Sequence, residues 1–148
     1  MQRFFDLLFS SVAIIFLLPL LIPVMVILRL TGEGEVFFRQ ARVGKDKVSF
    51  SLLKFATMLR NSEQMGAGTV TLKDDFRVLP VGAFLRKTKI NELPQLFNIL
   101  LGDMSIIGPR PLHIKQFSFY SDEDQIIIAS TVPRLSGIDS VIFIDEEK

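Results

Sequence analysis

The most pronounced pattern in the chain is an uninterrupted apolar run near its N-terminus. No charged residue occurs from Leu7 to Leu28. A helix of this length rises about 33 Å, which is enough to cross the hydrocarbon core of a bilayer. A cleaved signal peptide is the alternative, but the run is longer than a signal core and no Ala-x-Ala cleavage site follows it. The pattern therefore predicts a membrane helix over residues 1–30 and a second domain over residues 31–148.

Two prolines, Pro19 and Pro23, interrupt this run. Pro19 cannot donate a hydrogen bond to the carbonyl of Ile15, and its ring crowds that carbonyl, so the helix should kink or break there. Basic residues flank the run on both sides, at Arg3 and from Arg29 onward, and basic residues favour the cytoplasmic side. We therefore predict a re-entrant helix whose two ends lie on the same face. An ordinary kinked spanning helix is the alternative.

Shorter patterns predict the elements of the second domain. Residues Val36–Gly44 and Val48–Phe55 alternate partly around a polar turn, which indicates a β-hairpin. A short helix is predicted near Val81–Thr88. Ser121 precedes three acidic residues, as at the start of a helix, and this helix is predicted to continue to Ala129. Residues Val141–Ile144 could form a short strand or a membrane-surface anchor.

A polar pair, Asn91 and Glu92, precedes apolar residues that recur at helical spacing until Gly102. Asn91 is predicted to be the N-cap, with Pro94 in the first turn. Glu92 would then lie at the positive end of a helix dipole, which also attracts phosphate. The alternative is a purely structural role, in which the pair only caps a helix.

A stiff turn with a cationic side chain follows this predicted helix. Arg110 stands between two prolines in Gly108–Pro111, so its guanidinium is suited to binding phosphate through two parallel hydrogen bonds. Here too the alternative is a purely structural role, in which Arg110 is a turn residue on a solvent-exposed face.

Composition narrows the chemistry open to the chain. Its 148 residues suffice for one modest domain, and a net charge of +1 gives no general attraction to nucleic acid. The absence of cysteine excludes disulfides and thiolate metal sites. The single histidine, His113, excludes a cluster of several histidines around a metal.

Short motifs extend along nearly the whole chain. In order, they are Arg3–Asp6, the proline-interrupted run, Val36–Gly44, Lys54–Met58, Pro80–Thr88, Glu92–Asn98 and Gly102–Pro111. Together they resemble the bacterial sugar transferases of the monotopic phosphoglycosyl transferase superfamily. The resemblance implies transfer of a phospho-sugar from a UDP-sugar to a polyprenyl phosphate, such as undecaprenyl phosphate, with Mg²⁺. Such a reaction starts the assembly of a surface glycan or polysaccharide.

The resemblance also implies a fold and a location. The expected fold class is α+β, with a re-entrant N-terminal helix broken at proline and packed on a small cytoplasmic domain. That domain is expected to contain a short β-hairpin and several amphipathic helices. The expected location is the cytoplasmic face of the bacterial inner membrane, with membrane lipids as partners and no nucleic acid. Family members commonly continue beyond the position of Lys148, so an incomplete C-terminus is a further expectation.

The resemblance assigns roles to seven residues. Catalysis and Mg²⁺ binding fall to Asn91 and Glu92. Substrate binding falls to Arg86 and Arg110, and then to Lys54, Thr57 and Pro109.

Two positions depart from the family's pattern. The family usually has Asp at position 91 as the nucleophile and Arg at position 56, whereas this chain has Asn91 and Ala56. A carboxamide cannot serve as that nucleophile and is a weaker metal ligand than a carboxylate. Either Glu92 acts as the nucleophile or the acceptor phosphate attacks directly. We favour direct attack, because nothing in the sequence indicates that the Glu92 side chain extends closer to the donor phosphate.

Two further functions stay open. The chain could be a catalytically silent relative that binds nucleotide-sugar or polyprenyl phosphate. It could also be a membrane adaptor without a ligand, although that function leaves Glu92 and Gly108–Pro111 unexplained.

Overall fold

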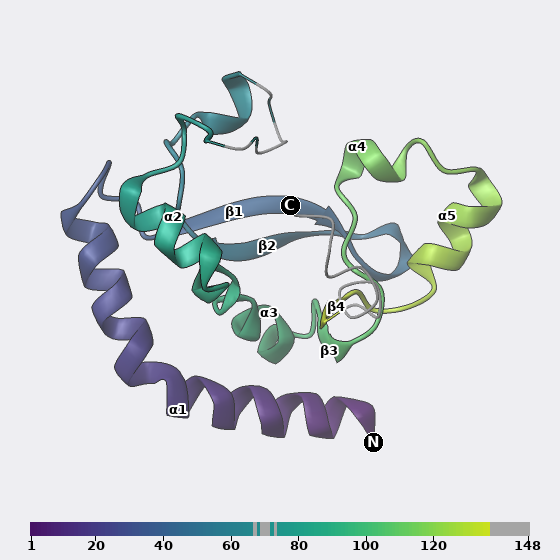
Figure 1. Cartoon of the computed structure of the whole chain (residues 1–148). Coiled ribbons are helices and arrows are strands. Elements are labelled where there is room, and N and C mark those ends of the chain that lie inside the picture. The colour runs from purple at the N-terminus through teal and green to yellow at the C-terminus, as the bar shows by residue number, and fades with distance from the viewer. Residues whose placement is uncertain (67, 69–71, 73, 137–148) are drawn as a thin grey trace. The chain divides into compact units, whose positions relative to one another are not determined.

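The computed structural model of the chain describes residues 1–66, 68, 72 and 74–136 (Figure 1). The described part mixes helices and strands, as predicted. The helices are α1 Gln2–Leu30, α2 Pro80–Lys87, α3 Gln95–Leu101, α4 Ile114–Phe117 and α5 Asp122–Ala129, and the short 3₁₀ helices are η1 Lys45–Lys47, η2 Ser62–Gln64 and η3 Ile90–Glu92. The strands are β1 Phe37–Val43, β2 Ser49–Phe55, β3 Ser105–Ile107 and β4 Arg134–Ser136. The predicted strand or anchor at residues 141–144 lies outside the described residues.

Two small sheets are present in the described residues. β1 and β2 form the predicted hairpin, with η1 as its turn. β3 and β4 pair in parallel, and Ser105 stands opposite Arg134. The second pair joins two segments that are far apart in the sequence, and the sequence patterns did not predict it.

The chain divides into two compact units. The first contains Met1–Ile15, Arg39–Leu52, and Gln95 with the described residues that follow it. The second contains Phe16–Phe38 and Leu53–Pro94. Each unit is therefore built from segments that are distant in the sequence. The division predicted from the sequence, at residues 30 and 31, concerns the membrane segment and stays a prediction.

The apolar run forms the long helix α1. It is long and apolar enough to cross a membrane, and only 17% of its most apolar 18-residue segment is buried. Pro19 and Pro23 both lie inside α1, which is assigned as one helix from Gln2 to Leu30. The break at proline and the re-entrant path therefore stay predictions.

The second unit has an apolar core to which α1 contributes. Leu21, Val24 and Leu28 of α1 are buried in one cluster with Phe55 of β2 and Leu85 of α2. Each fully buried side chain of this size contributes about 1.5–3 kcal/mol through the hydrophobic effect. This core fixes the end of β2 and the helix α2, which carry several of the predicted site residues.

In the first unit, polar side chains at the start of α1 hold that helix to α3 and β3. Asp6 is 6% exposed and accepts hydrogen bonds from the Ser105 hydroxyl at 2.6 Å and from the backbone N–H of Ile106 at 3.2 Å. Arg3 donates hydrogen bonds to the carbonyls of Ile99 and Leu100 at the end of α3. Arg3 and Asp6 thus hold the start of α1 within the first unit, and the topological role predicted for Arg3 stays a prediction.

Two of the predicted helices agree closely with the structure. α2 begins one residue before the predicted start, and Leu85 on its inner face is buried. α5 begins after Ser121, whose side chain accepts a hydrogen bond from the backbone N–H of Asp124. Gly102 ends α3 as predicted, with a φ of +99° that favours glycine.

Candidate active site

The start of the helix that contains Leu96 differs from the prediction. α3 begins at Gln95, and Asn91 and Glu92 lie in the preceding 3₁₀ turn η3. Asn91 is therefore not the N-cap of α3, and Glu92 does not lie at the N-terminus of an α-helix. The physical reason is Pro94, the third residue after Asn91, which has no N–H to donate to the Asn91 side chain as a capped helix requires. The chain forms the tighter bonds from Glu92 N to Lys89 O and from Leu93 N to Ile90 O instead, each 3.1 Å long.

Apolar neighbours hold this turn in the second unit. Ile90 and Leu93 pack against the core cluster, and the side chain of Pro94 is fully buried. Between them the side chain of Asn91 is only 7% exposed. Its carbonyl oxygen Oδ1 is buried and has no hydrogen-bond partner among the described residues. An unsatisfied buried acceptor costs about 1–3 kcal/mol, and this oxygen keeps an unused acceptor position.

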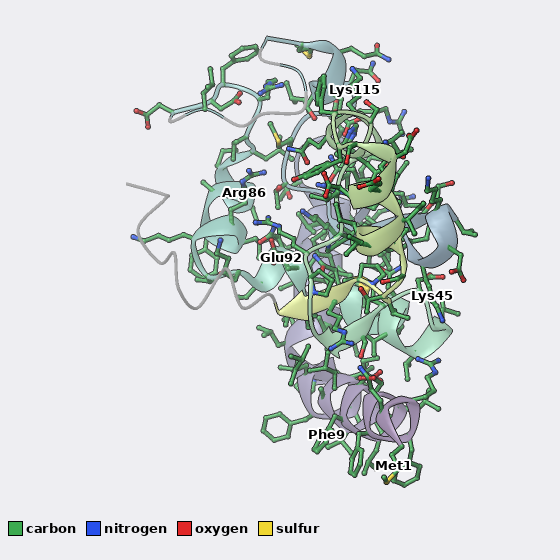
Figure 2. The ribbon with its side chains drawn as sticks, turned by 90° about the vertical axis from the view of Figure 1, so that its right-hand side faces the viewer. Met1, Phe9, Lys45, Arg86, Glu92 and Lys115 are labelled. Carbon is green, nitrogen blue, oxygen red and sulfur yellow. The ribbon has the colours of Figure 1, made fainter. Side chains whose placement is uncertain are left out.

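Glu92 is less enclosed than Asn91. It is half-buried, and it belongs to η3, which contacts α2. Arg86 on α2 is also half-buried, and Figure 2 labels both residues. A carboxylate and a guanidinium are thus carried by two neighbouring elements of one unit.

The start of α2 packs tightly against the backbone of Thr57. A Cβ atom on Gly82 would lie 2.1 Å from the carbonyl oxygen of Thr57, so only glycine fits there. That same carbonyl accepts a hydrogen bond of 2.9 Å from Leu79. One turn after Gly82, the Nη1 of Arg86 donates a long hydrogen bond of 3.4 Å to the Thr57 hydroxyl. The structure therefore brings together two of the predicted substrate-binding residues, Thr57 and Arg86.

Lys54 and Ala56 flank the end of β2. Lys54 is half-buried in the strand, and Ala56 is 5% exposed and donates its backbone N–H to the carbonyl of Val36 at 2.9 Å. The second unit thus contains Lys54, Thr57, Arg86, Asn91 and Glu92, five of the seven predicted site residues.

Pro109 and Arg110 belong to the first unit, in the segment Gly108–Pro111, here called the double-proline loop. Its backbone is held from two sides. Arg42 of β1 donates a hydrogen bond of 3.3 Å to the carbonyl of Pro111, and the backbone N–H of Arg134 donates one of 2.9 Å to the carbonyl of Pro109. Arg110 itself is exposed and lines a pocket together with Gly44 and Pro109. The loop thus carries an exposed cation beside a pocket, and the phosphate binding predicted for Arg110 stays a prediction.

The donor atoms near position 91 are few. No group of three or more His, Cys, Asp or Glu side chains that could hold a metal occurs in the described part of the chain. Mg²⁺ often binds proteins through one or two carboxylates plus substrate phosphates. The Glu92 carboxylate and the unpartnered Asn91 oxygen fit a metal that arrives with a phosphate ligand, and they do not form a complete protein cage.

Sequence reasoning missed one buried ion pair in the second unit. Arg77 is 1% exposed and pairs with Asp75 at 2.5 Å. Its Nη1 also donates hydrogen bonds to the carbonyls of Ser62, Met65 and Gly68 at 2.6–2.7 Å. The hydrogen bonds from Arg77 hold the pKa of Asp75 far below its usual range. The only sequence signal was a lone arginine among apolar residues after an acidic pair, which does not distinguish a buried guanidinium from an exposed one.

A family model described as bacterial sugar transferase matches residues 1–146. A UDP-N-acetylgalactosamine-undecaprenyl-phosphate N-acetylgalactosaminephosphotransferase of Aeromonas hydrophila is 46% identical over 110 residues, which cover 74% of this chain and 26% of that relative. A UDP-glucose:undecaprenyl-phosphate glucose-1-phosphate transferase of Klebsiella pneumoniae is 40% identical over 112 residues, covering 74% of this chain and 23% of the relative. The exopolysaccharide production protein ExoY of Rhizobium meliloti (strain 1021) is 34% identical over 151 residues, covering 93% of this chain and 66% of the relative. The chain spans between about a quarter and two thirds of the length of these relatives.

Proposed function

The chain belongs to the bacterial sugar transferase family, and from this premise we propose that it transfers a phospho-sugar from a UDP-sugar to a polyprenyl phosphate. The observation that carries the proposal is the family match over residues 1–146. The names of two relatives, which describe transfer of a sugar phosphate to undecaprenyl phosphate, support undecaprenyl phosphate as the acceptor. The proposed location is the cytoplasmic face of the inner membrane, with α1 as a re-entrant anchor.

The reaction is a substitution at phosphorus. An oxygen of the polyprenyl phosphate attacks the phosphorus that carries the sugar, and the bond from this phosphorus to the oxygen of UMP breaks. The products are UMP and a polyprenyl diphospho-sugar. Such displacements depend mainly on positioning and on neutralising phosphate charge.

We assign the charge neutralisation first to cations of the second unit. Arg86, whose position is fixed by Thr57 and by the packing of α2, would bind phosphate oxygens, and Lys54 would add a positive charge from the same unit. In the first unit, taken by itself, Arg110 and the turn at Pro109 are proposed to bind a substrate phosphate. Glu92 and Asn91 would hold Mg²⁺, which supplies further neutralisation of the diphosphate when it is bound.

Direct attack by the acceptor is the mechanism that fits position 91. The Asn91 side chain has no nucleophilic oxygen of the kind a covalent phospho-sugar intermediate needs. Its buried, unpartnered Oδ1 can instead accept a hydrogen bond or bind a cation brought by the substrate. Recovery of product without any phospho-sugar attached to the protein is the expected result, and isolation of an adduct on Glu92 would refute direct attack.

A second candidate function is a catalytically silent protein that binds nucleotide-sugar or polyprenyl phosphate. The amide at position 91 is the observation that favours it. Replacing Asn91 with Asp separates the two functions, because a native enzyme with direct attack should gain little from the new carboxylate. A large gain of transfer activity in Asn91→Asp would favour the silent form.

The experiment that tests the proposed function measures UMP release from several UDP-sugars by the full chain in lipid nanodiscs with undecaprenyl phosphate and Mg²⁺. The wild type should release UMP from at least one of them. Arg86→Gln should lower the rate by about a hundredfold or more, as expected for a group that neutralises transition-state charge. Glu92→Gln should lower it by a similar factor, because the change removes the carboxylate that would hold Mg²⁺. The absence of release from every UDP-sugar tested would contradict the proposal.

A further inference from the structure

Arg134, in β4, stands at the base of the double-proline loop. Its Cα is paired with that of Ser105 in the parallel pair of β3 and β4. Its backbone N–H donates a hydrogen bond of 2.9 Å to the carbonyl of Pro109, and Pro133 immediately before it lines the same pocket as Arg110. The backbone of position 134 is therefore fixed beside the loop that carries Arg110.

The side chain of Arg134 runs across Gly108. A Cβ atom built on Gly108 would lie 2.0 Å from the Cδ atom and 2.3 Å from the Nε atom of Arg134. The φ of Gly108 is +144°, a conformation that other residues rarely adopt. Glycine at 108 thus leaves a space beside the loop, and the Arg134 side chain fills it.

Arg134 is half-buried, and one nitrogen of its guanidinium is enclosed. Its Nε is buried and has no hydrogen-bond partner among the described residues. Within the same part of the chain, neither Arg134 nor Arg110 forms an ion pair. A buried N–H without an acceptor is costly, and a guanidinium keeps its charge at any physiological pH. Among the described residues, two positive charges without an ion-pair partner thus lie on adjacent segments of one unit, an arrangement that favours an anionic ligand.

We propose that Arg134 is a second phosphate-binding guanidinium, which acts with Arg110 on a phosphate group of a substrate. The inference rests on the proposed function and extends it, and the test below distinguishes a phosphate of the UDP-sugar from that of the polyprenyl phosphate. The Nε and a terminal nitrogen of arginine can donate two parallel hydrogen bonds to one phosphate. The competing explanation is structural: the Arg134 stem only covers Gly108.

The test compares Arg134→Gln, Arg134→Lys and the control Lys115→Gln in the full chain in nanodiscs. Lys115, labelled in Figure 2, lies exposed on α4, so its change removes the same charge at another place in the first unit. Binding of UDP is compared with binding of uridine, and binding of undecaprenyl phosphate with that of undecaprenol. Thermal melts accompany each variant, and Arg134→Lys keeps the charge if Arg134→Gln fails to fold.

We expect Arg134→Gln to weaken binding of either UDP or undecaprenyl phosphate by about tenfold to a hundredfold, the usual range for a hydrogen bond to a charged group. The affinity of Arg134→Lys for this phosphate ligand should lie between those of the wild type and Arg134→Gln, because an ammonium cannot donate two parallel hydrogen bonds to one phosphate. Binding of uridine and undecaprenol should not change, and Lys115→Gln should behave as the wild type. The ligand that loses affinity identifies the source of the phosphate.

Two results would overturn the inference. The first is unchanged affinity of folded Arg134→Gln, or of Arg134→Lys if only that variant folds, for both phosphate ligands. The second is an equal loss for uridine or undecaprenol, which indicates a structural role. Both results leave the proposed function intact if the wild type still releases UMP, whereas a wild type that binds neither phosphate ligand contradicts the inference and the proposed function together.

Discussion

At the scale of single residues, the candidate site depends on positions where one side chain alone fits its surroundings. Gly82 allows α2 to approach the carbonyl of Thr57, and the approach places Arg86 within reach of the Thr57 hydroxyl. Asn91 carries a buried oxygen that the protein itself leaves without a partner. The sequence motifs contain these residues, but the sequence could not show these contacts, because they join segments far apart in the chain.

Replacing Gly82 with Ala tests the tight packing of α2. Helix propensity alone would make alanine the better residue by about 1 kcal/mol. The clash with Thr57 should instead destabilise the protein by about 1–3 kcal/mol, as overpacking usually does. The measurement is the free energy of unfolding in detergent, with Ala83→Gly on the exposed face of α2 as the control. If Gly82→Ala proved more stable than the wild type, the packing described here would be incorrect.

The Asp75–Arg77 pair predicts a pH dependence of stability. Arg77 holds the pKa of Asp75 far below its unfolded value of about 3.9, so the pair stabilises the fold fully above that value. This stabilisation is lost as the pH falls toward the folded pKa. Asp75→Asn should therefore lower the melting temperature at neutral pH and show a smaller loss of stability between about pH 4 and pH 2.

The matched control for this prediction is Asp74→Asn, because Asp74 is the exposed neighbour of Asp75. It should melt close to the wild type at neutral pH and keep the acid dependence of the wild type. Equal acid dependence in Asp75→Asn and the wild type would show that the buried pair does not set the stability in this range.

At the scale of elements, local patterns predicted most of the structure. The hairpin of β1 and β2, the helices α2 and α5, and the stop at Gly102 all follow from alternation, capping and glycine signals. The start of α3 was misplaced because the capping pattern at Asn91 was given more weight than the missing N–H of Pro94. The parallel pairing of β3 with β4 had no local signal, since both strands are short and their partners are distant in the sequence.

The path of α1 in the membrane is an element-scale prediction. A re-entrant helix places residues 2 and 45 on the same side. The chain has no cysteine, so Gln2→Cys and Lys45→Cys each give a single site for a membrane-impermeant thiol reagent. Both variants should react in inverted inner-membrane vesicles and be protected in spheroplasts. Reaction of the two sites from opposite sides would establish a spanning helix.

At the scale of the whole molecule, one short chain contains both a long apolar helix and the cationic side chains predicted to bind phosphate. α1 leaves most of its apolar surface uncovered by protein, and exposed apolar side chains also occur beyond it, as at Phe119 and Ile127. Uncovered apolar surface of this kind is typical of a protein that works at a membrane. The family could be predicted from the sequence because its motifs span the chain, whereas the choice of sugar could not, since no motif among them distinguishes one sugar from another.

The central claim is that this chain transfers a phospho-sugar to a lipid phosphate with an amide at position 91. The most direct measurement follows both products in nanodiscs that contain undecaprenyl phosphate, a UDP-sugar and Mg²⁺, with mass spectrometry of the lipid fraction. The account predicts that UMP and undecaprenyl diphospho-sugar appear in equal amounts and that both disappear when undecaprenyl phosphate is omitted. UMP release without a lipid-linked sugar, or no reaction with any UDP-sugar, would contradict it.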